Sequence, residues 1–206
     1  LRRKGLVKNL LAAEILGSTS IICTDKTGTL TEAKMQVAGI FTGTKELLSD
    51  GEAYAEKVNQ NGLESHITVL KIATLCSDAY IENSEDETRR WIVRGRPIDK
   101  ALLLAGTQAG LSKKELEKIY PCHDELLFDA SYKYSAGLHH LNDNEDVIYI
   151  IGAPEKILGM SRFIELDGKQ EIFNDKKLAE LDSKLESLTG KALRVIAVGY
   201  KKIKKT

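Results

Sequence analysis

The spacing of apolar residues along the chain predicts a mixture of helices and strands. Several stretches place apolar residues three or four positions apart, which is the spacing of one helix face. Pro97 stands where a helix can begin, because a first-turn N–H has no partner to lose. Ser112 and Asn174 are predicted N-caps. This spacing predicts helices over residues 5–17, 63–82, 97–106, 112–120, 154–160 and 174–188.

Shorter apolar runs bounded by polar residues predict the strands. The runs between residues 129 and 151 follow one another closely, which is typical of an antiparallel meander. The polar stretch 43–62 is expected at the surface as a loop with a short helix, and the stretch 83–90 as a solvated loop. The predicted strands cover residues 18–24, 35–42, 125–129, 135–141, 147–151, 162–166 and 194–200.

Charge and composition narrow the class of protein. The sequence has 30 basic and 30 acidic residues, so its formal net charge is zero. Proteins that bind nucleic acid or anionic membranes carry a basic excess, so we expect neither partner. No apolar run approaches the roughly 20 residues that cross a bilayer, and this segment is expected to be soluble rather than membrane-inserted. The apolar fraction of 42% is ordinary for a folded globular chain.

Cysteine and histidine give no metal-ligand spacing. We expect the cysteines to be reduced thiols of a cytosolic chain. The histidines are expected at the surface, with metal binding a remote alternative. The residues concerned are Cys23, Cys76, Cys122, His66, His123, His139 and His140.

The segment Ile22–Thr31 places chemistry at the end of a predicted buried strand. Asp25 is followed at once by Lys26, and Gly28 softens the turn. The carboxyl ends of strands are where open α/β sheets bind ligands, and a glycine lets the backbone approach a phosphate. These residues fit a phosphoryl acceptor, with Asp25 as the nucleophile. An ordinary strand-to-turn exit is the alternative, since Asp and Gly are common there.

Resemblance to a known family favours the first alternative. Residues 25–31, Asp-Lys-Thr-Gly-Thr-Leu-Thr, resemble the phosphorylation signature of the P-type ion-transporting ATPases, and residues 13–23 are similar to its lead-in. The resemblance implies that Asp25 takes the γ-phosphate of ATP, with Lys26 beside the phosphate charge. It also implies that Asp25 and the backbone carbonyl of Thr27 hold Mg²⁺.

Two later segments, GRPIDKAL and FDASYK, resemble stretches of the family's nucleotide-binding domain. The resemblance implies that Asp99 lies near the adenine amino group, that Phe128 stacks on adenine and that Lys133 lies near the phosphates. Without it, Asp99 is an acid favoured in the first turn of a helix, and Phe128 is a core aromatic residue.

Two further segments, IIGAPEKIL and GKALRVIAVGY, are similar to other parts of that domain. The resemblance implies that Gly152 and Ala153 belong to the nucleotide site and that Arg194 reaches the phosphates. A surface-facing strand arginine is the alternative for Arg194. Ile151 departs from the family, which has a lysine lining the adenine pocket there. We therefore expect added apolar surface in the pocket and a weaker or altered nucleotide affinity.

The resemblance also implies a domain organisation. Residues 1–31 correspond to a stalk helix and the first strand of a haloacid-dehalogenase-like phosphorylation domain, which is incomplete here. Residues 32–206 correspond to an α/β (α+β) nucleotide-binding domain, an antiparallel sheet flanked by helices whose last strand is expected beyond Thr206.

The implied function is that of the ATP-binding part of an ion-transporting enzyme. Its cofactors are ATP and Mg²⁺, its partners are the membrane, actuator and phosphorylation domains of the same polypeptide, and its place is the cytoplasmic face of a membrane. Ca²⁺ is the first choice of ion. The later Mg²⁺-binding motifs of the family are absent from this sequence, so the isolated chain is expected to bind nucleotide without turning it over. A non-catalytic regulatory nucleotide-binding module and a truncated remnant are the alternatives.

Overall fold

The computed structural model describes residues 10–25, 29–32, 34–43, 45–49, 64–83, 90–166 and 168–205. The chain divides into two compact units, Leu1–Lys34 and Met35–Thr206. Among the helices that these residues form, none combines the length and the apolar character needed to cross a membrane.

The first unit contains helix α1 (Leu10–Gly17), which confirms the later part of the helix predicted over residues 5–17, whereas residues 5–9 lie outside the described residues. The strand predicted over residues 18–24 is wrong, because the described residues after α1 form no strand. Ile21 and Ile22 are each 78% exposed. A strand needs a neighbouring strand for its N–H and C=O groups, and the described part of this unit provides none.

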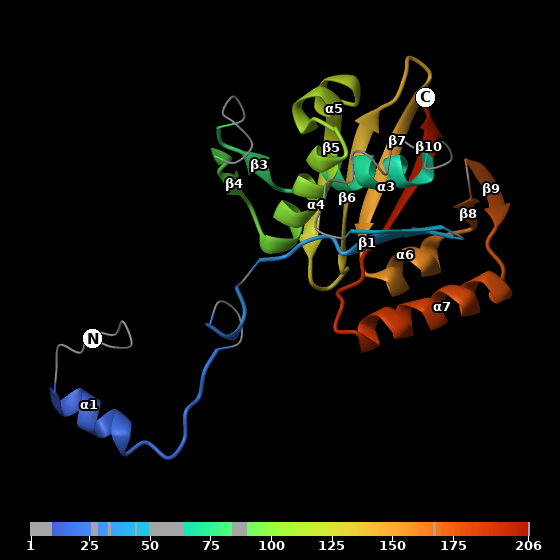
Figure 1. Ribbon diagram of the computed structural model, residues 1–206. Helices are drawn as coiled ribbons and strands as arrows, with labels where there is room; N and C mark the ends of the chain where they lie inside the picture. Colours follow the sequence, from blue (N-terminus) through green and yellow to red (C-terminus); the bar gives the residue numbers. More distant parts are fainter. Residues whose placement is uncertain are drawn as a thin grey trace. The chain divides into compact units, whose positions relative to one another are not determined.

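The second unit is built on a four-stranded antiparallel sheet (Figure 1). The predicted meander is confirmed, since β5, β6 and β7 pair in sequence order and β10 adds to the other side of β7. Alternate residues of β7 are buried, namely Val147, Tyr149 and Ile151, as expected for a strand with one face on the core. The four strands are β5 (Cys122–Asp129), β6 (Tyr134–His140), β7 (Glu145–Gly152) and β10 (Ala197–Lys204).

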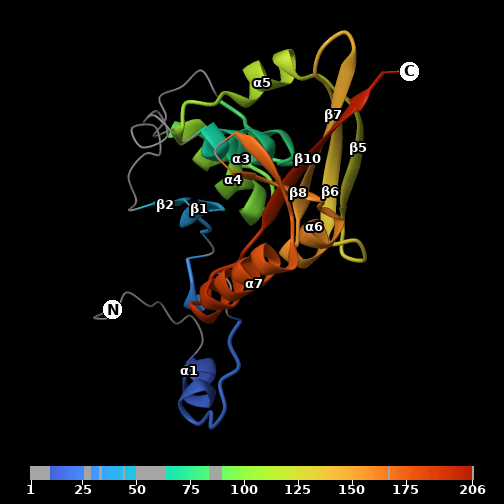
Figure 2. The same ribbon diagram turned by 90° about the vertical axis from the view of Figure 1, so that its right-hand side faces the viewer.

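Helices α3, α4 and α5 cover the core face of this sheet (Figures 1 and 2). Ile72 and Leu75 of α3 pack against β7, and so does Leu102 of α4. The predicted caps are confirmed: Ser112 accepts a hydrogen bond from the Glu115 amide, and Pro97 is the first residue of α4. The helices span Glu64–Leu75, Pro97–Gln108 and Lys113–Ile119.

Helix α3 ends earlier than the predicted helix over residues 63–82. Both the Ser77 amide and the Ser77 hydroxyl donate to the carbonyl of Thr74, the hydroxyl at 2.8 Å. A serine side chain that bonds to a nearby carbonyl offers the backbone an alternative to the helical ladder. The chain then enters strand β3 (Tyr80–Ile81), which pairs with β4 (Val93–Arg94).

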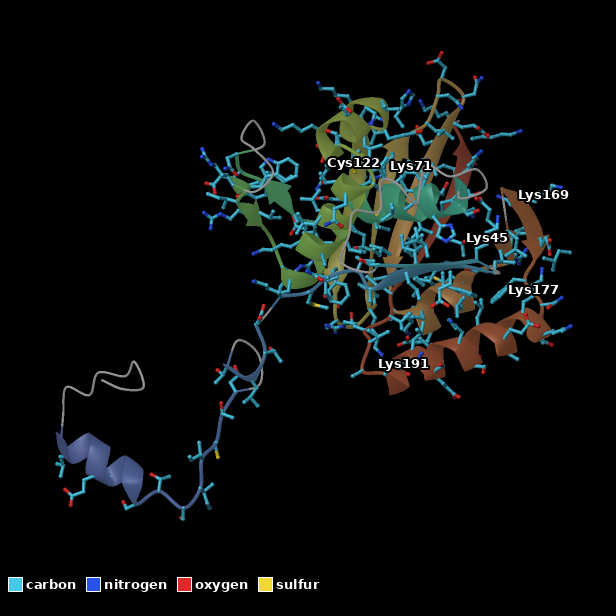
Figure 3. The ribbon with its side chains drawn as sticks, viewed as in Figure 1. Lys45, Lys71, Cys122, Lys169, Lys177 and Lys191 are labelled. Atoms are coloured by element: carbon cyan, nitrogen blue, oxygen red, sulfur yellow. The ribbon has the colours of Figure 1, made fainter. Side chains whose placement is uncertain are left out.

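The remaining elements lie around this central layer. Predicted helix 154–160 is observed as α6 with the same bounds, and Asn174 caps α7 as predicted, accepting from the Lys177 amide at 3.0 Å. Lys177, which is labelled in Figure 3, also forms an ion pair with Glu171 of the preceding hairpin. The elements are β1 (Gly39–Thr42), β2 (Lys45–Leu48), α6 (Pro154–Met160), β8 (Phe163–Leu166), β9 (Lys169–Ile172) and α7 (Asp175–Gly190).

Helix α7 is followed by a left-handed residue that is not glycine. Ala192 has a φ of 59°. Its amide bonds to the carbonyl of Thr189, and the Leu193 amide bonds to that of Leu188 at 3.2 Å. This is the Schellman arrangement, in which glycine usually takes the left-handed position.

Two of the four histidines are not at the surface, so that prediction is wrong for His66 and His139. They are 0% and 2% exposed. The ring of His66 lies 3.4 Å from the Thr42 hydroxyl, and His139 Nδ1 lies 2.9 Å from the carbonyl of Tyr120. Burial of a polar ring is tolerated where its nitrogen has a hydrogen-bond partner.

Candidate functional site

A cavity in the second unit contains Phe128. Phe128 lies on β5, an edge strand of the sheet, and 47% of its surface is exposed to solvent. The cavity has a volume of about 150 Å³ and lies between the end of α3, the start of α5 and strands β5 and β6. We refer to it as the Phe128 cavity. Ligand pockets commonly measure about 300 to 1,000 Å³, so this space suits a base rather than a whole nucleotide.

Arg96 lies over the ring of Phe128. Its guanidinium carbon is 5.6 Å from the ring centroid, and both residues line the cavity. Arg96 Nε donates to Asp99 Oδ2 at 2.7 Å. Asp99, in the first turn of α4, is only 7% exposed. The carboxylate therefore fixes the arginine, and the arginine covers the aromatic ring.

Lys133, Gly152 and Ala153 form a second group beside the turn between β5 and β6, at the same end of β5 as Phe128. Lys133 follows β5 with a φ of 63°, and its carbonyl accepts from the Ala153 amide at 2.9 Å. Its ammonium lies 3.2 Å from Glu155 Oε1. The pKa of Glu155 is held below its ordinary value, first by a hydrogen bond with its own amide and then by Lys133.

Gly152 is required for this close approach of strands. A Cβ at this position would lie 2.4 Å from Cβ of Tyr134 and 2.5 Å from the carbonyl oxygen of Lys133. No side chain fits there without movement of the backbone. The glycine of the Gly-Ala-Pro-Glu segment thus has a steric reason in this fold.

Ile151 lies in the core and not in the Phe128 cavity. It is 7% exposed and packs against Ala73 and Leu102. The expectation that Ile151 adds apolar surface to the pocket is therefore wrong, because helices α3 and α4 cover this row of the sheet. Its effect on nucleotide affinity stays a prediction.

Arg194 lies outside the observed strand, so the strand predicted over residues 194–200 starts too early. Strand β10 begins at Ala197, so the arginine stands in the preceding exposed segment. It is not among the residues that line the Phe128 cavity. Its proposed contact with phosphate is a prediction.

Asp25 lies in the first unit, exposed, and the hydroxyl of Thr24 donates to its carbonyl at 3.2 Å. Lys26 and Thr27, the other predicted catalytic residues, lie outside the described residues. An exposed carboxylate is a chemically suitable ligand for Mg²⁺, which prefers oxygen.

Sequence reasoning missed Arg96, although it lies within the GRPIDKAL segment. The available signal was the pair Arg96 and Asp99, three residues apart at a helix start, which brings opposite charges together. The stacking on Phe128 had no such signal, because only the fold brings Arg96, just before α4, over a residue of β5.

Comparison with known proteins gives the family. Residues 65–206 match the family described as P-type ATPase, cytoplasmic domain N. A calcium-transporting ATPase of Bacillus subtilis is 34% identical, and the match covers 99% of this chain and 24% of that protein. A calcium-transporting ATPase of Listeria monocytogenes is 31% identical, with 98% and 22% covered. The sodium/potassium-transporting ATPase subunit alpha of Drosophila melanogaster is 32% identical, with 93% and 19% covered.

The chain therefore spans about a quarter or less of the length of these relatives. The predicted family is confirmed by both kinds of match. The chain belongs to the P-type cation-transporting ATPase family, whose cytoplasmic domain N is represented by residues 65–206.

Proposed function

We propose that the second unit binds ATP, with the adenine in the Phe128 cavity. The observation that carries the proposal is the half-exposed ring of Phe128 in a cavity of the size of a base. Aromatic faces bind bases by stacking, and such contacts tolerate any base with a π-face. Lys133, Gly152 and Ala153 form the second part of the site, where Lys133 supplies positive charge toward the phosphates. Arg194 supplies a second positive charge there.

The guanidinium of Arg96 is too close to the ring for a base to enter between them. A base between two stacked partners needs about 7 Å, or two contact distances of about 3.5 Å. The present separation is 5.6 Å. A base that stacks on the face of Phe128 that Arg96 covers therefore displaces Arg96 and releases Asp99 toward the ligand.

The whole protein to which such a segment belongs couples ATP hydrolysis to cation transport in this proposal. Relatives named as calcium-transporting ATPases support Ca²⁺ as the first choice of ion. Asp25 attacks the γ-phosphorus of ATP, ADP leaves, and the aspartyl-phosphate is later hydrolysed. In this proposal the ammonium of Lys26 would neutralise charge on the transferred phosphate.

In this proposal Asp25 and the carbonyl of Thr27 would hold Mg²⁺, which would supply positive charge to neutralise the phosphates. The remaining steps need the other domains of the polypeptide, including the rest of a haloacid-dehalogenase-like phosphorylation domain, at the cytoplasmic face of a membrane. We expect the isolated chain to bind ATP but to form no stable phosphate on Asp25, since the positioning groups are elsewhere.

An ATP titration of the 206-residue chain by amide NMR tests nucleotide binding. We expect shifts at Asp99, Phe128, Lys133 and Gly152, and their loss in Phe128→Ala. Circular dichroism of both proteins establishes that each is folded. A folded parent without shifts at millimolar ATP contradicts the proposal.

A phosphorylation assay separates the enzyme from a regulatory module. The isolated chain is incubated with radiolabelled ATP and Mg²⁺, and labelled protein is treated with hydroxylamine, which cleaves acyl phosphates. We expect no such label on the isolated chain and a labile label on the full-length protein that Asp25→Asn abolishes. Absence of that label in the full-length protein favours a non-catalytic nucleotide-binding module.

A further inference from the structure

Three potential metal ligands come together on the sheet, away from the Phe128 cavity residues described above. His123 lies on β5, His140 on β6 and Asp146 on β7. Their ligand atoms all lie within 4.8 Å of one another. The antiparallel register explains this, because His140 is directly opposite Asp146, and the rings of His123 and His140 meet edge to face at 6.0 Å.

The carboxylate of Asp146 has an oxygen that the fold leaves without a hydrogen bond. Asp146 Oδ1 is shielded from solvent, and no described group hydrogen-bonds to it. Two nitrogen atoms lie near it without hydrogen-bond geometry, His140 Nδ1 at 3.5 Å and the Lys205 ammonium at 3.4 Å. A shielded oxygen without a hydrogen bond calls for an ion or a water.

A cation already occupies part of this space. The ammonium of Lys205 is 2.8 Å from His140 Nδ1 and donates to the carbonyl of Asn142 at 3.0 Å. The cluster therefore attracts positive charge. Lys205 is the cation that a metal ion must displace.

Two imidazole nitrogens and one carboxylate oxygen form a common three-ligand set for Zn²⁺, with the fourth position left to water. Ligand bonds of about 2.0–2.2 Å in a tetrahedron place ligand atoms roughly 3.3 Å apart. The exposed ring of His123 and the half-buried ring of His140 need modest rotations to reach this spacing.

We propose that His123, His140 and Asp146 form a binding site for Zn²⁺ or a similar first-row divalent cation. The ion joins three neighbouring strands, and Lys205 competes with it. This metal site shares no residue with the proposed nucleotide site, so an experiment can refute either proposal without affecting the other.

Zinc titration of the 206-residue chain without an affinity tag tests the site. Calorimetry at neutral pH measures the affinity, and Co²⁺ substitution reports the geometry by its visible absorption. We expect one equivalent of Zn²⁺ to bind the parent and a loss of about tenfold or more in His123→Ala, because one of three ligands is removed. Asp143→Asn, on the same hairpin, is the matched control for Asp146→Asn, and only the latter weakens binding.

Lys205→Met gives a result of the opposite sign. Removing the competing ammonium strengthens Zn²⁺ binding by about tenfold, since a neighbouring like charge disfavours the ion. Thermal unfolding supplies a second readout, because bound Zn²⁺ raises the melting temperature of the parent but not of His123→Ala. Equal Zn²⁺ affinity in the parent and His123→Ala overturns the proposal, and so does the absence of binding in both the parent and Lys205→Met.

Discussion

Replacement of Arg96 by alanine is expected to strengthen binding of the base. Arg96 loses two contacts when a base stacks on the ring of Phe128. The cation–π contact at 5.6 Å is worth about 0.5–1 kcal/mol at an exposed site. The ion pair of Arg96 with Asp99 is worth about 0.2–1 kcal/mol, because the arginine side chain is 53% exposed and its charge is screened. The sum of about 0.7–2 kcal/mol corresponds to about 3- to 30-fold in Kd.

Adenosine is the sharpest probe, because it has a base but no phosphate charge that Arg96 could attract. Affinities for adenosine and ATP are measured by NMR titration of the parent and Arg96→Ala. Arg94→Ala is the matched control, since it removes the same charge from the exposed pair of Arg94 with Glu82 at 2.9 Å. Its affinity should equal that of the parent.

Three outcomes of this titration separate the hypotheses. Tighter adenosine binding in Arg96→Ala alone supports displacement. Unchanged or weaker binding in Arg96→Ala, with binding lost in Phe128→Ala, refutes it and makes Arg96 a supporting wall of the site. Absence of binding in every folded variant refutes nucleotide binding itself.

Three further predictions concern stability. Gly152→Ala should destabilise the fold by about 2 kcal/mol or more, because the new Cβ would lie 2.5 Å from a backbone oxygen. The control Gly159→Ala has nothing within 4 Å of the new Cβ, so it should be neutral or stabilising by up to about 1 kcal/mol. Equal urea midpoints for the two variants would contradict this prediction. Ile151→Val should lower the free energy of unfolding by about 1 kcal/mol, because it truncates a core side chain. Ile151→Lys should lower it by at least about 3 kcal/mol, because it buries an unpaired charge. A lysine variant as stable as the valine variant would show that the lysine side chain leaves the core. Burial raises the pKa of the Cys76 thiol from 9.0 to about 12, and nearby Cys122 contributes to the rise. The folded thiol therefore keeps its proton at a pH where the unfolded thiol ionises. The free energy of unfolding consequently falls as pH rises from 9 toward 12. Under reducing conditions this decrease in the free energy of unfolding should reach about 1–1.5 kcal/mol near pH 10. If Cys76→Ala shows the same decrease, other groups cause it.

Local chemistry made some elements predictable. The start of α6 follows from Pro154, and the starts of α5 and α7 follow from Ser112 and Asn174 as caps. These signals act within one helical turn, so no knowledge of the fold is needed. The meander was predictable for a similar reason, since its three strands succeed one another along the chain.

Elements that depend on distant partners were not predictable. Strands β2 and β9, KELL and KQEI, lack apolar alternation and exist because a neighbouring strand pairs with them. The run Ser18–Thr24 has the opposite property, an apolar strand pattern without a strand in the described structure. Strand formation is thus decided by pairing more than by composition.

The same contrast holds for the candidate sites. Family resemblance indicated Asp99 and Phe128 separately, but the arginine that links them was visible only in the fold. The cluster of His123, His140 and Asp146 has no motif spacing in the sequence. It arises from the register of three strands, which a sequence pattern does not specify.

Lys133 and Ala192 have the left-handed backbone conformation that costs any residue other than glycine about 1 kcal/mol or more. A search for greater thermostability would replace both with glycine. At Ala192 that change improves a helix end and removes only a methyl group. At Lys133 it removes the ammonium that faces Glu155. Under the proposed function, selection for stability and selection for function act differently at these two positions. Ala192 can be replaced to increase stability, whereas Lys133 keeps its strained backbone because its charge is needed.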